Sequence, residues 1–345
     1  MKKILIGVVA VVVLVPAVAF AYLKTMKPAQ RPAPTEAIEA TPERIARGKY
    51  LSETVVGCVQ CHSEFDFEHY TIPEVPGSEY AGGFCFDKEV AGFPGKVCAQ
   101  NLTPDKETGI GAWTDGEILR AFREGVSRDG HALFPMMPYP YLRTMSDEDA
   151  KSVVVYLRTL PAVKKETPAG FIDFPVNLFI KFEPKPLDAP VPEPDHKDTV
   201  AYGKYLATLA CLECHTPVDS TMHPVAGKEY SGGREFDMSS KFPGMKFASA
   251  NITPDEETGM GQKSRENFIA VFKSFSDPEY RAMKVPGSAN TLMPWIRFSQ
   301  LTEEDLGAIY DYLRTVPAMK NAVERRPPPK IAAKAEATPA ATPTK

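Results

Sequence analysis

Cys58-Val-Gln-Cys61-His62 recurs later in the chain as Cys211-Leu-Glu-Cys214-His215. In a c-type haem site, two cysteine thiols join the vinyl groups of the porphyrin and the adjacent histidine becomes an axial ligand of the iron. A redox dithiol has no need of the histidine, and a zinc site needs a further pair of ligands for each C-x-x-C. Two complete copies therefore predict two covalently attached haem c groups.

The composition fits two globular units. The chain has 345 residues, 43% of them hydrophobic, which is enough for two domains with real cores. A formal net charge of −4 argues against a nucleic-acid-binding surface. Four of the six cysteines belong to the two motifs, so Cys85 and Cys98 are the candidates for a disulfide. The alternative is that one of these two thiolates ligates a haem iron.

An uncharged apolar run covers residues 4–23. Its length is close to the ~20 residues of a membrane-spanning helix, although Ala17-Val18-Ala19 and Ala19-Phe20-Ala21 are typical of a signal cleavage site. We expect residues 1–23 to act as an export signal that is retained as a membrane anchor. Covalent haem attachment requires the globular part to lie outside the cytoplasm in either case.

Each haem motif follows a helix and precedes a second helix. Thr41 is the expected N-cap of one first helix, with Pro42 at its first helical position, and Asp198 is the expected N-cap of the other. Gly-Lys-Tyr-Leu occurs in both first helices, at 48–51 and 203–206. Both last helices end in Tyr-Leu-Arg-Thr-x-Pro, at 156–161 and 312–317. A glycine inside a helix indicates close approach by another element. We therefore expect the first and last helices to cross at Gly48/Tyr156 and at Gly203/Tyr312.

The loops between these helices also repeat. Tyr-x-Gly-Gly, Asn-x-Thr-Pro-Asp and Thr-Gly-x-Gly all match at an offset of 150 residues, while the last helices match at 156. Turn residues of this kind predict ordered surface loops, and the change of offset places a six-residue insertion in the second unit. The sequence thus predicts a duplicated all-α fold of two tandem helical haem cups with long ordered loops. The predicted ranges are 1–23 signal or anchor helix, 24–41 Pro-rich linker, 42–161 first domain, 162–197 Pro-rich linker laid across both domains, 198–318 second domain and 319–345 disordered tail.

The sixth iron ligand decides between electron transfer and chemistry at an open iron. No histidine outside the attachment motifs recurs in both units, but Met137-Pro138 and Met293-Pro294 do, each nine residues before the cap of the last helix. Methionine and histidine together are the ligand set of electron-carrying cytochromes. The iron ligands predicted by this repeat are His62 and Met137 in the first unit, and His215 and Met293 in the second.

These motifs, taken in order, resemble the class I cytochrome c domains of di-haem proteins and of the cytochrome c subunits of bacterial periplasmic dehydrogenases. The resemblance covers about residues 43–318 and rests on C-x-x-C-H, N-L/I-T-P-D, T-G-x-G, M-P and Y-L-R-T-x-P. It implies that the methionine of each Met-Pro pair is the distal ligand, which is Met137 and Met293 here. It also implies redox partners: a dehydrogenase catalytic subunit, a quinol-oxidising complex or a terminal oxidase. The expected location is the periplasmic side of the bacterial inner membrane, or the periplasm itself if the signal is cleaved.

Three functions compete. The first is an electron relay without substrate turnover, and the second is a di-haem peroxidase, in which one iron is open or differently ligated. Both units carry the Met-Pro loop, so the asymmetry that a peroxidase requires is missing from the sequence. The third, a haem enzyme of sulfur metabolism with a cysteine ligand, depends on Cys85 or Cys98 alone.

Overall fold

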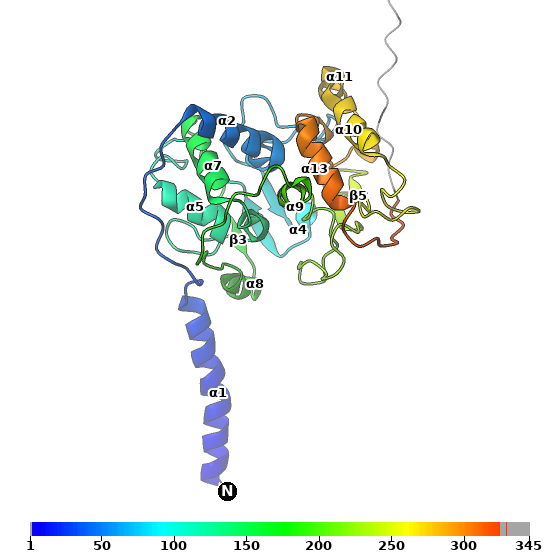
Figure 1. Ribbon diagram of the computed structural model, residues 1–345. Helices are drawn as coiled ribbons and strands as arrows, with labels where there is room; N and C mark the ends of the chain where they lie inside the picture. The colour runs from blue at the N-terminus through cyan, green and yellow to red at the C-terminus, as the bar shows by residue number, and fades with distance from the viewer. Residues whose placement is uncertain (1, 325–328, 330–345) are drawn as a thin grey trace, which may run out of the picture.

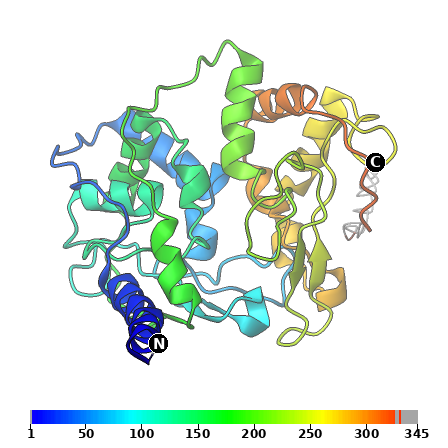
Figure 2. The same cartoon turned by 90° about the horizontal axis from the view of Figure 1, so that it is seen from below.

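The computed structural model describes residues 2–324 and 329. Its body is rich in helices and has two similar halves that lie side by side, with one long helix projecting from it (Figure 1, Figure 2). We call residues 42–161 the first half, residues 162–197 the linker and residues 198–318 the second half. The first half contains α2 (Pro42–Tyr50), η1 (Leu51–Val55), α3 (Cys58–Cys61), β1 (Cys85–Asp87), α4 (Lys88–Ala91), β2 (Gly95–Cys98), α5 (Asp115–Glu124), α6 (Tyr139–Leu142) and α7 (Asp147–Thr159).

The linker and the second half hold the remaining elements. The linker contains β3 (Phe171–Ile172), α8 (Val176–Phe179) and η2 (Ile180–Phe182). The second half contains α9 (Thr199–Ala210), β4 (Glu235–Asp237), β5 (Lys246–Ala248), α10 (Arg265–Lys273), η3 (Ser274–Ser276), α11 (Pro278–Ala282), η4 (Gly287–Ala289), α12 (Trp295–Phe298) and α13 (Glu303–Leu313).

The projecting helix is α1 (Lys2–Thr25). The Lys181 ammonium of the linker donates hydrogen bonds to the carbonyls of Leu23 and Lys24, at 2.8 and 2.9 Å, and so satisfies acceptors at the helix C-terminus. Among the residues that the structure describes, no helix combines the length and the apolar character needed to cross a membrane. The membrane anchor expected for residues 1–23 stays a prediction from the sequence.

The helix crossings predicted from the repeated glycines are confirmed. A Cβ atom on Gly48 would lie 1.9 Å from the Ser152 carbonyl oxygen and 2.8 Å from Tyr156 Cβ. A Cβ atom on Gly203 would lie 1.8 Å from a carbonyl oxygen of α13 and 3.0 Å from Tyr312 Cβ. Only glycine permits backbones to approach this closely, so the repeated glycine sets how α2 packs on α7 and how α9 packs on α13.

The caps form as expected. Thr41, Asp198, Ser146 and Thr302 each accept a hydrogen bond from a backbone N–H in the first turn of α2, α9, α7 and α13, respectively. Acidic residues fill the first turns of α7 and α13, where they complement the positive end of the helix. The first turn of each last helix is thereby well defined, which matters for the contacts between the halves.

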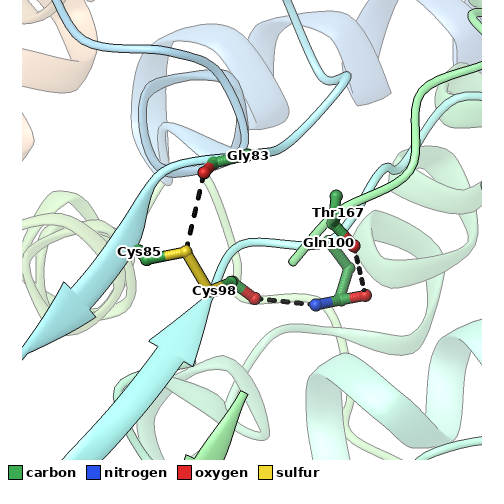
Figure 3. The surroundings of a disulfide bond; sticks show 5 residues. All are labelled: Gly83, Cys85, Cys98, Gln100 and Thr167. Atoms are coloured by element: carbon green, nitrogen blue, oxygen red, sulfur yellow. Dashed lines mark hydrogen bonds between the residues drawn. A yellow bond between two sulfur atoms is a disulfide. The ribbon is translucent and has the colours of Figure 1, made fainter. Parts of the chain in front are cut away.

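The short strands are a departure from the all-α prediction. β1 and β2 form an antiparallel hairpin that β3 of the linker extends, and β4 and β5 form the matching hairpin of the second half. Strands of two to four residues are too short to give the alternating pattern by which strands are recognised in sequence. Cys85 lies opposite Cys98 in the first hairpin, and the predicted disulfide joins them (Figure 3).

The two halves exchange contacts through their first and last helices. The Tyr50 hydroxyl donates a hydrogen bond to Asp305 of the second half, and the Tyr205 hydroxyl donates one to Asp149 of the first, both at 2.6 Å. Each phenol oxygen also accepts a hydrogen bond from the amide of the N-cap residue of the same last helix. The halves are therefore joined by two equivalent polar contacts.

A second interface is made by the part of the second half that contains the predicted insertion. There α11 and the loop after it cross to the first half, where Tyr70 N–H donates to the Met283 carbonyl at 2.9 Å. The buried Asn290 side chain accepts from Thr71 N–H at 3.0 Å and donates to the His69 carbonyl at 2.9 Å. The inserted residues thus help to hold the halves in one relative position.

The linker contacts both halves, as predicted. Its Val163 carbonyl accepts a hydrogen bond from the Asn101 amide at 2.7 Å, and its Glu183 Oε1 lies within hydrogen-bond distance, 3.2 Å, of His223 Nε2 in the second half. The residue equivalent to Val163 is Met319, whose carbonyl accepts from the Asn251 amide, also at 2.7 Å. The first residues of the predicted tail therefore pack on the second half, while residues 325–328 and 330–345 of that tail lie outside the described residues.

Candidate haem attachment sites

Both predicted proximal histidines are held by a backbone carbonyl. Nδ1 of His62 lies 2.7 Å from the Gln100 carbonyl oxygen, and Nδ1 of His215 lies 2.8 Å from that of Ala250. A carbonyl can only accept, so Nδ1 carries the proton and Nε2 keeps its lone pair. Burial lowers the pKa of both imidazoles, against an opposing effect of these hydrogen bonds, and so favours the neutral form that binds metal.

The repeated Tyr-x-Gly-Gly loops fix the same histidines from the backbone side. Gly82 N–H donates to the His62 carbonyl at 2.7 Å, and Gly232 N–H donates to the His215 carbonyl at 2.8 Å. A Cβ atom on Gly82 would lie 2.5 Å from the Ala99 carbonyl oxygen, beside the residue that accepts from the imidazole. Glycine is therefore required at position 82, because the segment that binds the His62 backbone and the segment that binds its imidazole lie too close together for a side chain. Sequence comparison of the halves identified the motif but not this role.

The four attachment cysteines are unpaired thiols in matching environments. Cys58 and Cys211 are half-buried, while Cys61 and Cys214 are exposed. Desolvation raises the pKa of the thiols, to about 11 in the first motif and about 12 in the second. A redox-active dithiol has a lowered thiol pKa, so these surroundings do not favour thioredoxin-like chemistry. Among the described residues, no group of three or more His, Cys, Asp or Glu side chains is arranged to hold a metal ion.

The tyrosine of each Tyr-x-Gly-Gly loop provides a test of whether a large cofactor fits. Tyr80 and Tyr230 are both 2% exposed, and neither hydroxyl has a hydrogen-bond partner among the described residues. After burial itself, the nearby groups that raise the pKa of these phenols include Cys58 for Tyr80 and Cys211 for Tyr230. A buried hydroxyl without a partner costs about 1–3 kcal/mol. The matching pair beside the attachment cysteines therefore fits sites built around a cofactor with polar groups, as haem is.

The two Met-Pro loops have the same local structure. The Met137 carbonyl accepts from Tyr139 N–H at 2.7 Å, and the Met293 carbonyl accepts from Trp295 N–H at 2.8 Å. Both methionine side chains are partly buried and pack against the core that Cys58 also contacts. Their equivalence fits two sites of the same kind, and their ligation of iron stays a prediction.

The two attachment motifs lie near each other across the interface between the halves. Glu213, inside the second motif, raises the pKa of Cys61 in the first motif as well as that of its neighbour Cys214, in both cases after burial. Burial, followed by the charge of Glu213, also raises the pKa of Tyr141, to about 12. Tyr141 follows the first Met-Pro pair, so the first half contributes a side chain beside the second motif.

The reciprocal contact involves Arg297, which follows the second Met-Pro pair. Its Nη1 donates to the carbonyls of Thr54 and Val55, just before the first motif, at 2.9 and 3.1 Å. Arg297 and Tyr141 occupy equivalent positions, 156 residues apart. Sequence reasoning missed Arg297 because it followed residues that repeat, and the only signal for it was a mismatch within a repeat.

A surface cleft lies apart from the predicted haem-binding residues. An opening of about 520 Å³ at the junction of the halves is lined by Phe67, Phe242 and Met245 among others. None of the predicted haem-binding residues lines it.

Two C-x-x-C-H motifs with tethered, neutral histidines in a helical fold are the features expected of c-type haem attachment sites. No family model matches the chain. It is 29% identical to the cytochrome c subunit of a quinone-dependent alcohol dehydrogenase from Gluconacetobacter polyoxogenes, over 87% of this chain and 60% of that subunit. It is 30% identical to the cytochrome subunit of fructose dehydrogenase from Gluconobacter japonicus, over 84% of this chain and 56% of that subunit.

A third relative matches the chain in length. The chain is 26% identical to a diheme c-type cytochrome from Cereibacter sphaeroides, over 76% of this chain and 83% of that protein. The resemblance seen in the sequence is thus confirmed: the homologues are cytochrome c subunits of bacterial dehydrogenases and a diheme cytochrome c. The chain spans only about 60% of the length of the dehydrogenase subunits it matches.

Proposed function

We propose that this protein is a di-haem c-type cytochrome that relays electrons between a dehydrogenase or quinol donor and a downstream acceptor, with His/Met ligation at both irons. The observation that carries the proposal is the equivalence of the two sites. Each has a complete attachment motif, a histidine tied through Nδ1 to a carbonyl, and a Met-Pro loop with the same turn. A peroxidase needs two unlike sites, whereas both loops here carry the Met-Pro pair in the same turn.

Bound haem supplies an iron that changes between the ferric and ferrous states. The residues of the chain would hold each haem, orient its histidine ligand and set its reduction potential. Cys58, Cys61, Cys211 and Cys214 would hold the cofactors covalently, and the carbonyls of Gln100 and Ala250 orient the histidine rings. Met137 and Met293 would close the sixth positions and raise the potentials. Contacts between the halves keep the two sites in a fixed relation, so that electron transfer requires little rearrangement.

The names of the relatives support a dehydrogenase catalytic subunit as the donor, and a quinol-oxidising complex or a terminal oxidase is the other partner that we propose. Transfer between such partners takes place through weak, short-lived encounters. We propose a periplasmic location, supported by the apolar N-terminal run and by the chemistry of covalent haem attachment. Membrane attachment through residues 4–23 stays a prediction from the sequence, which fractionation of cells into membrane and periplasmic extracts checks.

The oxidised absorption spectrum, with haem counted per chain, tests the function directly. We expect two haems and a weak red band, characteristic of a methionine–ferric iron bond, whose intensity accounts for both. A band that accounts for one haem would mean that the second iron is open or differently ligated. The peroxidase and thiolate alternatives would then replace the relay.

A further inference from the structure

Arg297 is a cation placed at the boundary of the two haem sites. It comes from α12 of the second half, and its guanidinium reaches the end of η1 in the first half, where its Nη1 makes both of its hydrogen bonds to backbone carbonyls. A Cβ atom on Gly57 would lie 2.5 Å from that Nη1, so the residue directly before Cys58 is small enough to admit it. The guanidinium also lies over the Phe298 ring, with its carbon 4.3 Å from the ring centroid.

The charge of Arg297 is not cancelled within the described part of the chain. No acidic side chain there forms an ion pair with it, and its Nε is buried without a hydrogen-bond partner. The other arginine near the motifs differs in this respect, because Arg234 lies 3.6 Å from the Glu213 carboxylate. Backbone carbonyls and an aromatic face compensate Arg297 only in part, since they carry no net charge.

Arg297 is also tied to the second site. It lies on α12, four residues after Met293, the predicted distal ligand of the second haem. In the first half its guanidinium lies beside Gly57, the residue directly before the attachment cysteine Cys58. When the attachment thiols are joined to haem they carry no charge, so they would not neutralise the cation of Arg297.

We propose that Arg297 is a positioning residue shared by the two haem sites. From the second half, its hydrogen bonds fix the backbone just before the first motif, and its charge raises the reduction potential of both haems. Reduction removes one positive charge from the iron centre, so a fixed nearby cation favours the ferrous state. In a partly buried site this effect is long-ranged and weakly screened by salt. The inference rests on the proposed function.

Potentiometric titration of the full-length protein, followed by haem absorption, tests it. Arg297→Gln and Arg297→Met are two neutral variants of similar length, so that either one that holds both haems gives the result. We expect both midpoint potentials to fall, with a change of about tenfold in each ferrous/ferric equilibrium constant, which corresponds to about 59 mV. Arg297→Lys keeps the charge but loses the planar fork, and we expect its potentials to stay near those of the wild type.

Arg314→Gln is the matched control. Arg314 is exposed and its Nη1 donates to the Gly261 carbonyl at 2.8 Å, so the variant removes an equal charge at the surface. A fall in only one potential, an equal fall in Arg297→Lys, or an equal fall in Arg314→Gln would overturn the shared role of Arg297. Failure of the relay function itself has a different readout, because the wild-type protein would then lack two haems or two reversible one-electron steps.

Discussion

Tyr50 of the first half donates a hydrogen bond to Asp305 of the second, with 2.6 Å between the phenol oxygen and Oδ2. The equivalent tyrosine of the second half, Tyr205, makes the same contact to Asp149. Each tyrosine stands on the first helix of one half and reaches the first turn of the last helix of the other. The repeated Gly-Lys-Tyr-Leu motif therefore serves two purposes, since its glycine packs within a half and its tyrosine joins the halves.

The first prediction concerns this contact. Tyr50→Phe removes the donor and leaves the nearly buried Asp305 carboxylate without it. Hydrogen bonds to charged groups contribute about 1.5–3 kcal/mol, so we expect the free energy of unfolding in urea to fall by about that amount. Tyr310→Phe is the control, because its hydroxyl donates to the Lys263 carbonyl at the surface of a single half. If the free energy of unfolding falls equally in the two variants, the contact between the halves contributes no more to stability than a surface hydrogen bond within one half.

The second prediction concerns alkaline pH. Burial raises the pKa of Tyr202 and Tyr141 to about 12, above the value of about 10 for tyrosine in an unfolded chain. Above pH ~10 the unfolded state therefore binds fewer protons than the folded state, and stability falls as pH rises. We expect these tyrosines to add no pH dependence below about pH 10, and the free energy of unfolding to decline between about 10 and 12. Urea titrations across this range check it, and Tyr202→Phe should give a shallower decline than the wild type.

Much of this architecture follows from repetition in the sequence. The close approach at Gly48 and Tyr156 was predictable because a glycine inside a helix has few other physical reasons to recur. The contacts between the halves were not predictable in the same way. The pattern that places Tyr50 near the first turn of a last helix fits Asp149 of its own half as well as Asp305, and only the three-dimensional arrangement distinguishes them.

The haem sites likewise combine features that the sequence predicts with features that it does not. The attachment motifs and their histidines were evident from residue type and spacing, whereas Gln100 and Ala250 act through backbone carbonyls and leave no signal in their side chains. Arg297 has a tyrosine, Tyr141, at the equivalent position of the other half, so the arginine does not repeat. Its role arises from the packing of two halves against each other, which no local pattern records.

The third prediction concerns the helix crossing. Gly48→Ala places a methyl group 1.9 Å from the Ser152 carbonyl oxygen, so α2 must move away from α7. Overpacking of this kind costs about 1–3 kcal/mol or more, and we expect lower stability together with reduced haem content per chain. Gly77→Ala is the control: a Cβ atom there meets nothing within 4 Å, and only its positive φ of 86° opposes the change. A full haem content and an unchanged urea midpoint in Gly48→Ala would contradict the crossing.

The fourth prediction concerns the disulfide. Cys85 and Cys98 are 13 residues apart, and the matching hairpin of the second half has Glu235 and Ala248 at these positions without a crosslink. Replacing the pair by Glu and Ala should lower the free energy of unfolding by about 2–4 kcal/mol, as expected for a loop of this size. Haem content and both potentials should stay unchanged, because the second site is built without the crosslink. A change in the haem spectrum would instead support thiolate ligation by one of these cysteines.

The last prediction assigns the distal ligands. Met137→Ala and Met293→Ala each remove one predicted ligand, and because Met/His ligation raises the potential, each variant should lower the potential of one haem. The weak red band should lose about half its intensity in either variant. Met136→Leu is the control, since Leu292 occupies the equivalent place in the second half. If neither alanine variant changes the spectrum or the titration, the sixth ligand is a different residue, and the equivalence of the two Met-Pro loops reflects packing alone.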